Sequence, residues 1–455
     1  MTSQPTSSTR RSITRLAFGA AFLAVSATAC SAQMSLTAAV DLALKADPRV
    51  RMARASVAKA EAVVSEARDV YIPSVGIKGG YGASTGVPLS VPVVFSLASN
   101  SLIFDFSQKD NVRAANDGLK AAQLALLDAQ AVTSEDTVVT YLNLNNAERR
   151  HAAMLDESLY ANRLATIVQQ RLDAGQDNRM DLLKAKRAAA QIRLATLNNE
   201  DEIANLTQHL SQLLGLPGTA VATVSESVPP LPDPSSIQLA SDDSYGVQSA
   251  FAVAKSKQES AFGEARYRYH PQVAFGANYS RISTSHTSYS LYYPGFVNQH
   301  SDNALSAGIE ITIPIFDYEH RAHARESQAE AIRAMAEAEN NRVQFLEGRA
   351  KTQRSLAELS AKGEIAHLDR SIAQEQLDAI LIQLNSSSSS EGSGPMMTPK
   401  DEQNARLQER QKTVDMLTSE QELQQAEIGL LRQNGQLGDW LKQALRAQDA
   451  LPVTH

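Results

Sequence analysis

A stretch of sequence without proline runs from Ser107 to Leu216 and sets the scale of the fold. Proline inside a helix removes a backbone hydrogen bond and clashes with the preceding turn, so a run without it is compatible with continuous helix. The best turn signal within the run is Arg171-Leu172-Asp173-Ala174-Gly175-Gln176-Asp177-Asn178. We therefore expect two antiparallel helices that meet near Gly175. The first has about 65 residues and is roughly 100 Å long at 1.5 Å per residue.

The return helix and a second proline-free run extend this pattern. The return helix carries apolar residues at the 3-4-3 spacing of a coiled-coil seam, at Ile203, Leu206, Leu210 and Leu213. A second run without proline, from Tyr318 to Asn385, predicts another long helix, with a return helix from about Lys400 to Leu445. Aromatic residues make up only 5% of the chain, which favours long helices over a compact mixed core.

The two halves of the chain repeat one plan. The first half contains Glu61, Glu66-Ala67-Arg68, Tyr71 and Pro73, and 198 residues later the same spacing recurs in Glu259, Glu264-Ala265-Arg266, Tyr269 and Pro271. Further along, Leu102-Ile103-Phe104-Asp105 is echoed by Pro314-Ile315-Phe316-Asp317. Each half therefore predicts a helix, a pair of strands and a long helical hairpin.

The repeated motifs mark where the chain changes structure. Pro73 and Pro271 predict helix-to-strand junctions, because a proline and the residue before it favour leaving a helix. The pairs Phe104-Asp105 and Phe316-Asp317 predict strand-to-helix junctions, in which the aspartate caps the next helix.

These junctions divide the chain into five parts. We expect a signal peptide at residues 1–32, a first repeat at 33–216, a linker at 217–243, a second repeat at 244–446 and a tail at 447–455. The β-hairpins are expected at about 74–104 and 272–316, and the helix before each runs from Pro48 to Tyr71 and from about Ser244 to Tyr269. The second helical tip is a Ser/Gly/Pro-rich segment at 386–399, which predicts a flexible loop.

The expected strands alternate between apolar and polar residues with a period of two. Val273, Phe275, Ala277 and Tyr279 share one face of the first strand of the second pair, as do Ala307, Ile309, Ile311 and Ile313 of the second. Such alternation is typical of an outer-membrane barrel, and also of a half-buried antiparallel sheet in a soluble domain. Since the smallest membrane barrels use about eight strands, four strands per chain require a ring of chains. The count alone allows a dimer or a trimer.

The N-terminus favours the membrane interpretation. Arg10, Arg11 and Arg15 precede an apolar run at residues 16–25 and then small residues, as in a secretory signal. That run is too short for a permanent transmembrane helix, and no later stretch of about 18 apolar residues follows. A spanning segment would therefore have to belong to a β-barrel, because only helices and closed barrels satisfy the backbone in lipid.

Other classes of function find little support. The formal net charge is −7 without a basic stripe, so nucleic-acid binding is not expected. The chain has no recognisable catalytic motif, and we expect it not to be an enzyme. His320 and His323 lie at i and i+3 without an acidic or cysteine partner, so we expect neither a metal nor a cofactor.

The mature chain resembles the TolC-like family of outer-membrane efflux proteins. The resemblance rests on the order of several motifs over about 400 residues, together with the duplication: residues 35–44 with Asp47-Pro48, residues 67–74, Phe104-Asp105, residues 171–175 with Met180-Asp181-Leu182-Leu183, and Leu213-Leu214-Gly215-Leu216-Pro217. It implies a mainly α protein with a membrane β-barrel. Three chains would build a twelve-stranded barrel in the outer membrane, continued through the periplasm by a helical barrel of about 100 Å.

The same resemblance implies a function. The chain would be the exit duct of a tripartite efflux or type I secretion system, docked on a periplasmic adaptor that is fed by an inner-membrane pump of RND or ABC type. The turn formed by Arg171, Leu172, Asp173, Ala174 and Gly175 would contact the adaptor. The loop at 386–399 departs from the family's compact second hairpin tip. The alternative function is a periplasmic coiled-coil scaffold or adaptor without a barrel. The sequence leaves three classes of exported substrate open: drugs, metals and proteins.

Cys30 is the only cysteine, and its place after the apolar run is that of a lipoprotein cysteine. Two arguments favour an unmodified residue. The helix from Pro48 climbs about 36 Å towards the barrel, whereas the residues from Cys30 to Ser35 reach at most about 20 Å. In addition, Ala27 stands where lipoprotein signals usually carry Leu. We predict that the mass of the mature N-terminus fits an unmodified start at Cys30 or Gln33. A diacylglyceryl group on Cys30 would contradict this.

Overall fold

The computed structural model describes residues 32–80, 93–232, 243–267, 270–282, 303–387 and 398–449. The expected signal segment with Cys30, residues 388–397 of the second tip and the last residues of the expected tail lie outside these ranges.

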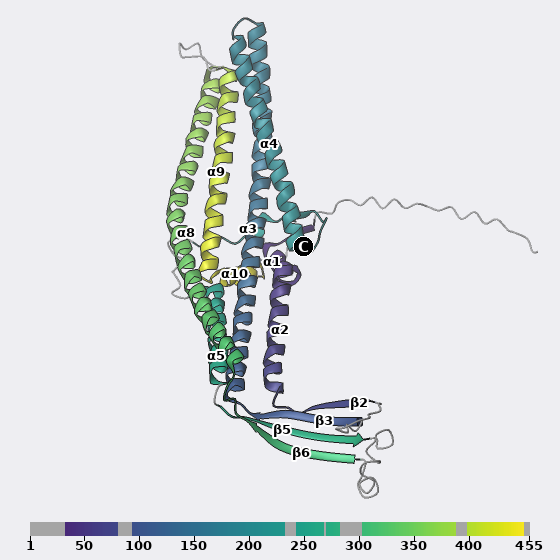
Figure 1. Cartoon of the computed structure of the whole chain (residues 1–455). Coiled ribbons are helices and arrows are strands. Elements are labelled where there is room, and N and C mark those ends of the chain that lie inside the picture. The colour runs from purple at the N-terminus through teal and green to yellow at the C-terminus, as the bar shows by residue number, and fades with distance from the viewer. Residues whose placement is uncertain are drawn as a thin grey trace, which may run out of the picture.

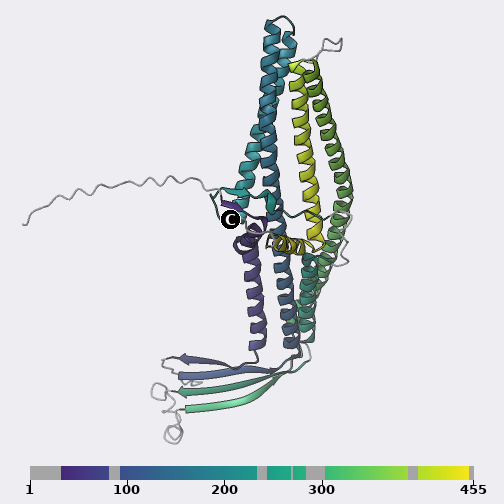
Figure 2. The ribbon, with the colours of Figure 1, turned by 180° about the vertical axis from the view of Figure 1, so that it is seen from behind.

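The chain forms a long helical shaft with a sheet extending from one end (Figures 1 and 2). In chain order its elements are β1 (Ala32–Met34), α1 (Leu36–Ala46), α2 (Pro48–Asp69), β2 (Ser74–Gly79), β3 (Val93–Phe104), α3 (Phe106–Asp173), α4 (Arg179–Leu213), β4 (Val221–Thr223), a 3-10 turn (Ser225–Ser227), α5 (Tyr245–Arg266), β5 (Gln272–Ile282), β6 (Asn303–Thr312), α8 (Tyr318–Ser387), α9 (Pro399–Gln433) and α10 (Leu437–Asp449). The fold class expected from the sequence, mainly α with paired strands, is confirmed. Within the described residues, no helix is both long enough and apolar enough to cross a membrane.

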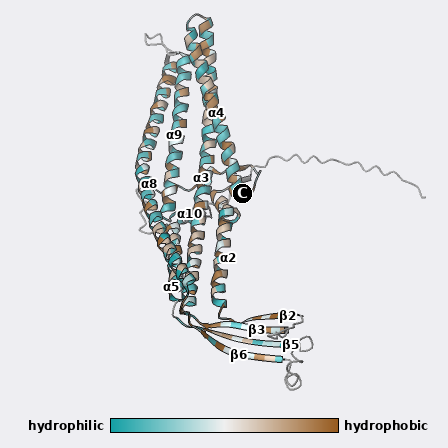
Figure 3. Ribbon diagram, viewed as in Figure 1, coloured by the Kyte–Doolittle hydropathy of each residue, from teal (hydrophilic) through white to brown (hydrophobic). Residues whose placement is uncertain are grey.

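Two helices run the length of the shaft. α3 has 68 residues and α8 has 70, so each is roughly 100 Å long. In the half of the shaft next to the sheet, contacts join α2 to α3, α3 to α5 and α5 to α8. In the other half, α3 contacts α4 and α9, and α9 contacts α8. Polar and apolar residues are interspersed along the helices rather than collected in one long apolar segment (Figure 3).

The expected return helix from Lys400 to Leu445 is wrong in one respect, because it is two helices. α9 ends at Gln433, and Gly435 adopts a positive φ of 71°. The amide of Gln436 then donates to the carbonyl of Leu431 at 2.8 Å, which closes the end of the helix. Beyond this turn α10 leaves the axis of α9 and crosses the shaft (Figure 1).

The main hydrophobic core lies at mid-shaft, where α1, α4, α9 and α10 meet α3. Tyr141 of α3 is fully buried there, and its hydroxyl connects three segments. It lies 2.7 Å from the carbonyl of Met34, accepts from the amide of Val224 at 2.7 Å and lies 3.0 Å from Oγ of Ser227. The core cluster consists of Leu36, Ala39, Val40, Ala43, Val138, Tyr141, Leu142, Leu144, Leu210, Leu214, Val221, Ile428, Leu431, Leu437, Trp440 and Leu441.

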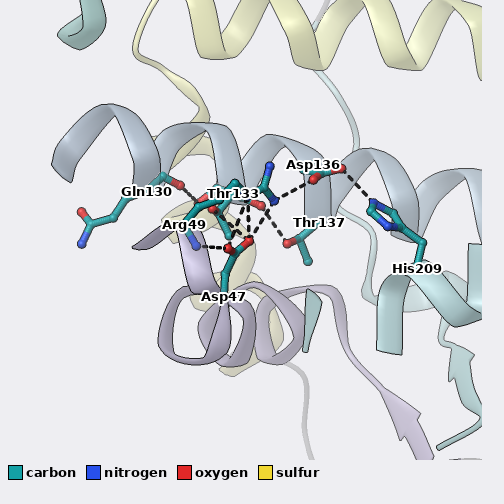
Figure 4. Close-up of polar contacts among 8 residues, drawn as sticks. Asp47, Arg49, Gln130, Thr133, Asp136, Thr137 and His209 are labelled. Atoms are coloured by element: carbon teal, nitrogen blue, oxygen red, sulfur yellow. Dashed lines mark hydrogen bonds and ion pairs between the residues drawn. The ribbon is translucent and has the colours of Figure 1, made fainter. Parts of the chain in front are cut away.

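A buried aspartate fixes the corner between α1 and α2 to the same region (Figure 4). Asp47 accepts a hydrogen bond from the amide of Arg49 at 2.6 Å and one from the hydroxyl of Thr133 at 3.3 Å. The Arg49 guanidinium bridges Asp47 at 2.8 Å and Asp136 at 2.7 Å, and His209 of α4 lies 3.3 Å from Asp136. Burial raises the pKa of Asp47, but its hydrogen bonds with Arg49 and Thr133 outweigh burial and leave that pKa below its usual value.

The Tyr141 network yields a stability prediction. Tyr141→Phe removes the hydroxyl and with it the acceptor of the Val224 amide, at a cost of about 1–3 kcal/mol. We expect a lower melting temperature for the detergent-solubilised protein, measured by circular dichroism. Tyr245→Phe is the matched control, since the side chain of Tyr245 is 40% exposed. Equal melting temperatures for the two variants would contradict the assignment.

Candidate channel surfaces

The four-stranded sheet has two chemically different faces. Its strands are antiparallel in the order β2-β3-β5-β6. Because side chains alternate along a strand, residues in register across the sheet lie on the same face. One register row joins Ile77, Leu97, Tyr279 and Leu305, and the next residue along β2 belongs to a row of Lys78, Ser96, Ser280 and Ala304.

The apolar face is the one that the alternation predicts. Val273, Phe275, Ala277 and Tyr279 lie opposite Ile311, Ile309, Ala307 and Leu305, respectively. The side chains on β5 are half-buried, whereas those on β6 are exposed: Leu305 is 78% exposed and Ile309 is 66% exposed. The opposite face carries Lys78, Ser96, Asn278, Ser280, Ser306, Glu310 and Thr312. The sheet thus presents an apolar face and a polar face, both open.

The margins of this sheet are also open. Within the described residues, β2 pairs only with β3, and β6 pairs only with β5. Each margin therefore presents backbone groups on which a further strand can pair. The sheet can be extended at both ends, but it does not close on itself.

The predicted junction residues lie where strands and helices meet. Pro73 immediately precedes β2, and Pro271 immediately precedes β5. Asp105 is buried and accepts from the Ser107 amide at 2.9 Å, which caps α3. In the second repeat, Asp317 accepts from the amide of His320 at 2.9 Å at the start of α8.

The two phenylalanines at these junctions have different surroundings. Phe104 packs edge-on against Phe106, with ring centroids 4.8 Å apart, and the ammonium group of Lys109 lies 4.4 Å from its ring centre. Phe316 is 82% exposed. The Phe-Asp motif therefore has the same position in both repeats, but the contacts of its phenylalanine differ.

The first tip of the shaft is a tight turn. Gly175 has a positive φ of 73°, which favours glycine, and the amide of Gln176 donates to the Arg171 carbonyl at 2.8 Å. Leu172, Asp173 and Ala174 form the last residues before it, at the end of α3. This geometry explains the glycine, and it places residues 171–175 at the end of the shaft away from the sheet (Figure 1).

An ionic contact joins this turn to the second hairpin, which the sequence pattern did not predict. The carboxylate of Asp177 lies 3.1 Å from Nε of Arg171 and 3.2 Å from Nζ of Lys400, near the start of α9. Burial raises the pKa of Asp177, but hydrogen bonds from Arg171 and Lys400 outweigh it and hold that pKa below its usual value. The carboxylate is therefore ionised, and the contact intact, throughout the neutral range. It is lost only as the pH falls through the lowered pKa.

The two histidines that share a helix face have separate partners. His320 lies 2.7 Å from Glu264 of α5, and its ring stacks on Tyr267 with centroids 3.7 Å apart. His323 lies 3.4 Å from Glu326. The described part of the chain contains no group of three or more side chains arranged to hold a metal ion.

Comparison with known proteins gives matches of three kinds. The family model for outer membrane efflux proteins matches residues 39–216. Protein CyaE of Bordetella pertussis is 26% identical over 310 residues, which cover 64% of this chain and 62% of that relative. The alignment thus spans less than two thirds of the relative's length.

Solved structures match over most of the chain. The CmeC outer membrane channel of Campylobacter jejuni is 14% identical, with a TM-score of 0.69 over 91% of this chain and 89% of that one. The outer membrane protein VceC of Vibrio cholerae is 17% identical, with a TM-score of 0.68 over 88% of this chain and 96% of that one. At such identities the structural match establishes the fold. The chain therefore has the fold of these outer membrane channels, and residues 39–216 match the model of the outer membrane efflux proteins.

Proposed function

We propose that this chain is one subunit of a passive exit duct in the outer membrane, serving a tripartite efflux or type I secretion system. The observation that carries the proposal is the sheet at the end of a shaft roughly 100 Å long. The apolar face of the sheet suits lipid, its polar face suits a wet lumen, and its two margins are open. The long shaft then extends into the periplasm.

Assembly into a ring follows from the strand count. Four strands per chain give eight in a dimer and twelve in a trimer. The trimer agrees with the family, and three copies of the helical shaft would enclose the periplasmic part of the duct. Transport through such a duct is passive, and selection of the substrate belongs to the pump.

The tip at Arg171 to Gly175 is the surface we assign to the periplasmic adaptor. It is the end of the shaft farthest from the sheet, and its backbone is fixed by the Gly175 turn and by the contact of Asp177 with Lys400. The inner-membrane pump, of RND or ABC type, then engages the duct through the adaptor.

The alternative, a periplasmic scaffold without a barrel, is separated from the duct by fractionation. We expect the chain in the outer-membrane fraction after washing with high salt, and a mass of three chains for the detergent-purified protein. A scaffold would remain in the soluble fraction. A soluble monomer would therefore overturn the proposal, and a stable dimer in the membrane would overturn the trimer.

The adaptor assignment is tested at Gly175. A Cβ at this position would meet no atom within 4 Å, so Gly175→Val strains only the backbone of the turn. We expect the variant to reach the membrane as a trimer but to lose adaptor cross-linking and efflux of a fluorescent pump substrate. Gly348→Val is the matched control, because Gly348 lies within α8, is exposed and also has open space at its Cβ. Equal efflux by the two variants would contradict the assignment of this tip as the adaptor-contact surface.

A further inference from the structure

The apolar face of the sheet continues onto one side of the shaft. The pairing of β3 with β5 shifts register after Leu102, and beyond the shift Phe104 lies opposite Val273, a residue of the apolar face. Residues opposite each other on neighbouring strands share a face, so Phe104 belongs to the apolar face too. The ammonium group of Lys109, in the first turn of α3, lies 4.4 Å from the centre of the Phe104 ring. Lys109 is exposed and marks the side of the shaft that continues this face.

Cations of α3 and α5 lie next to one another on this side. Arg113 follows Lys109 by four residues, so the two share a helix face. Arg113 lies 2.9 Å from Asp110, and Arg266, the last residue of α5, lies 3.1 Å from the same carboxylate. Asp110 is buried, whereas both arginines are exposed. The two helices therefore present three exposed cations beside one buried carboxylate.

The same side of the shaft extends to α8. Phe262 precedes Arg266 by four residues, so both lie on one face of α5. Phe262 lines a cleft of about 580 Å³ between α5 and α8, which is also lined by Arg321 and Arg325. These two arginines are exposed and are themselves four residues apart. α8 therefore adds two cations to those of α3 and α5.

Arg68 extends the band to α2. Its guanidinium donates to Oδ1 of Asn116 in α3 at 3.1 Å, and Asn116 follows Arg113 by three residues. All the cations of the band lie within about 11 Å of the sheet end of their helices, at 1.5 Å per residue. We call this band the basic collar, and it consists of Arg68, Lys109, Arg113, Arg266, Arg321 and Arg325.

The collar contains cations that the chain itself does not neutralise. Within the described residues, only Arg113 and Arg266 of the collar form an ion pair, with the shared carboxylate of Asp110. The further carboxylates that border the collar are those of Asp69, Asp105 and Asp317, and the last two cap α3 and α8. The collar is therefore net positive, and its other cations are available to an anionic partner.

The opposite side of the same helices is richer in carboxylates. There Lys257 of α5 lies 2.9 Å from Glu330 of α8 and borders, with Glu66, a groove over α3. Glu326 and Glu337 lie four residues before and seven residues after Glu330, on the same face of α8, and both are exposed. The excess of cations is therefore confined to the side that continues the apolar face of the sheet.

We propose that the basic collar binds the phosphate headgroups of anionic phospholipids in the periplasmic leaflet of the outer membrane. This inference rests on the proposed function, which places the apolar face of the sheet in lipid. Headgroups of the adjoining leaflet then lie at the level of the collar and on its side of the shaft. Lys and Arg attract anionic lipids at a membrane surface, and both bind phosphate through charge-assisted hydrogen bonds.

Bound headgroups would fix the depth of the duct in the membrane. The collar includes a side chain from each of α2, α3, α5 and α8, the helices that adjoin the four strands of the sheet (Figure 1). Each junction between strand and helix thus has a cation at the membrane surface. An anionic leaflet would therefore oppose movement of the sheet along the membrane normal.

Competition between two lipids tests the collar. The full-length protein, purified in a neutral detergent, is mixed with equal amounts of dioleoyl phosphatidylglycerol and dioleoyl phosphatidylcholine, which differ only in the headgroup. Native mass spectrometry then counts the lipids bound to the assembly. One cation near an anionic surface contributes roughly 1 kcal/mol, which is about fivefold in a binding constant. We expect phosphatidylglycerol to exceed phosphatidylcholine on the unaltered chain by about fivefold or more.

Three substitutions should remove this preference without leaving a carboxylate unpaired. Lys109→Gln, Arg321→Gln and Arg325→Gln together should bring the ratio of the two bound lipids close to one. The matched control removes the same number of exposed cations from the opposite side, with Lys59→Gln, Lys257→Gln and Arg333→Gln. The control should keep the lipid ratio of the unaltered chain.

Two results would overturn the collar as the lipid site. One is an equal amount of the two lipids on the unaltered chain, and the other is the same lipid ratio in both triple variants. Glycerol phosphate separates a lipid from free phosphate, because it carries the headgroup phosphate without the acyl chains. A large excess should leave the bound phosphatidylglycerol in place. Its displacement would show that the collar binds phosphate from solution, and would overturn the lipid as the partner.

Failure of the collar is distinguishable from failure of the proposed duct. A membrane trimer that shows no preference between the two lipids would overturn the collar and leave the duct intact. A soluble monomer would defeat the duct, and the collar with it.

Discussion

The open margins of the four-stranded sheet are the constraint on which the assembly depends. Backbone groups along the outer sides of β2 and β6 have no strand partner among the described residues of the chain. In lipid no water is present to satisfy them, so a sheet with an apolar face can enter a bilayer only when its margins are paired. Because each strand continues into a helix, pairing of the margins also determines which helices become neighbours. In the proposed duct, a requirement of the backbone in the membrane thus organises the shaft outside the membrane.

The duplication gives the chain two similar halves, but helix contacts at mid-shaft join these halves into one unit. α3 belongs to the first repeat and yet contacts α5 and α9 of the second. Around it, Tyr141 connects β1 to the 3-10 turn that follows β4, while Asp47 and Arg49 fasten the α1–α2 corner. Tyr141 and Asp47 are buried, so mid-shaft combines apolar packing with hydrogen bonds of fixed direction.

Local patterns in the sequence predicted the regular elements well and their mutual contacts poorly. The absence of proline predicted α3 and α8, and period-two alternation predicted the faces of the sheet, because both depend on neighbours within a few residues. The break at Gly435 was missed, although the glycine is a recognised helix end. The contact between Asp177 and Lys400 joins residues of different repeats, and the one between Arg49 and Asp136 joins different helices. No local pattern encodes such contacts. The number of chains in the proposed ring, likewise, is not contained in one chain.

The ends of the helices have a mechanical consequence. α4 and α9 stop near mid-shaft, α2 and α5 begin near it, and only α3 and α8 continue through it among the described helices (Figure 1). At that level two continuous rods per chain carry any bending or torsion between tip and sheet, whereas four share it above and below. The helical framework is therefore least stiff at mid-shaft. The stiffness of the shaft at that level depends on side-chain packing. The larger of the two core clusters of the described residues lies at the level where the fewest helices continue.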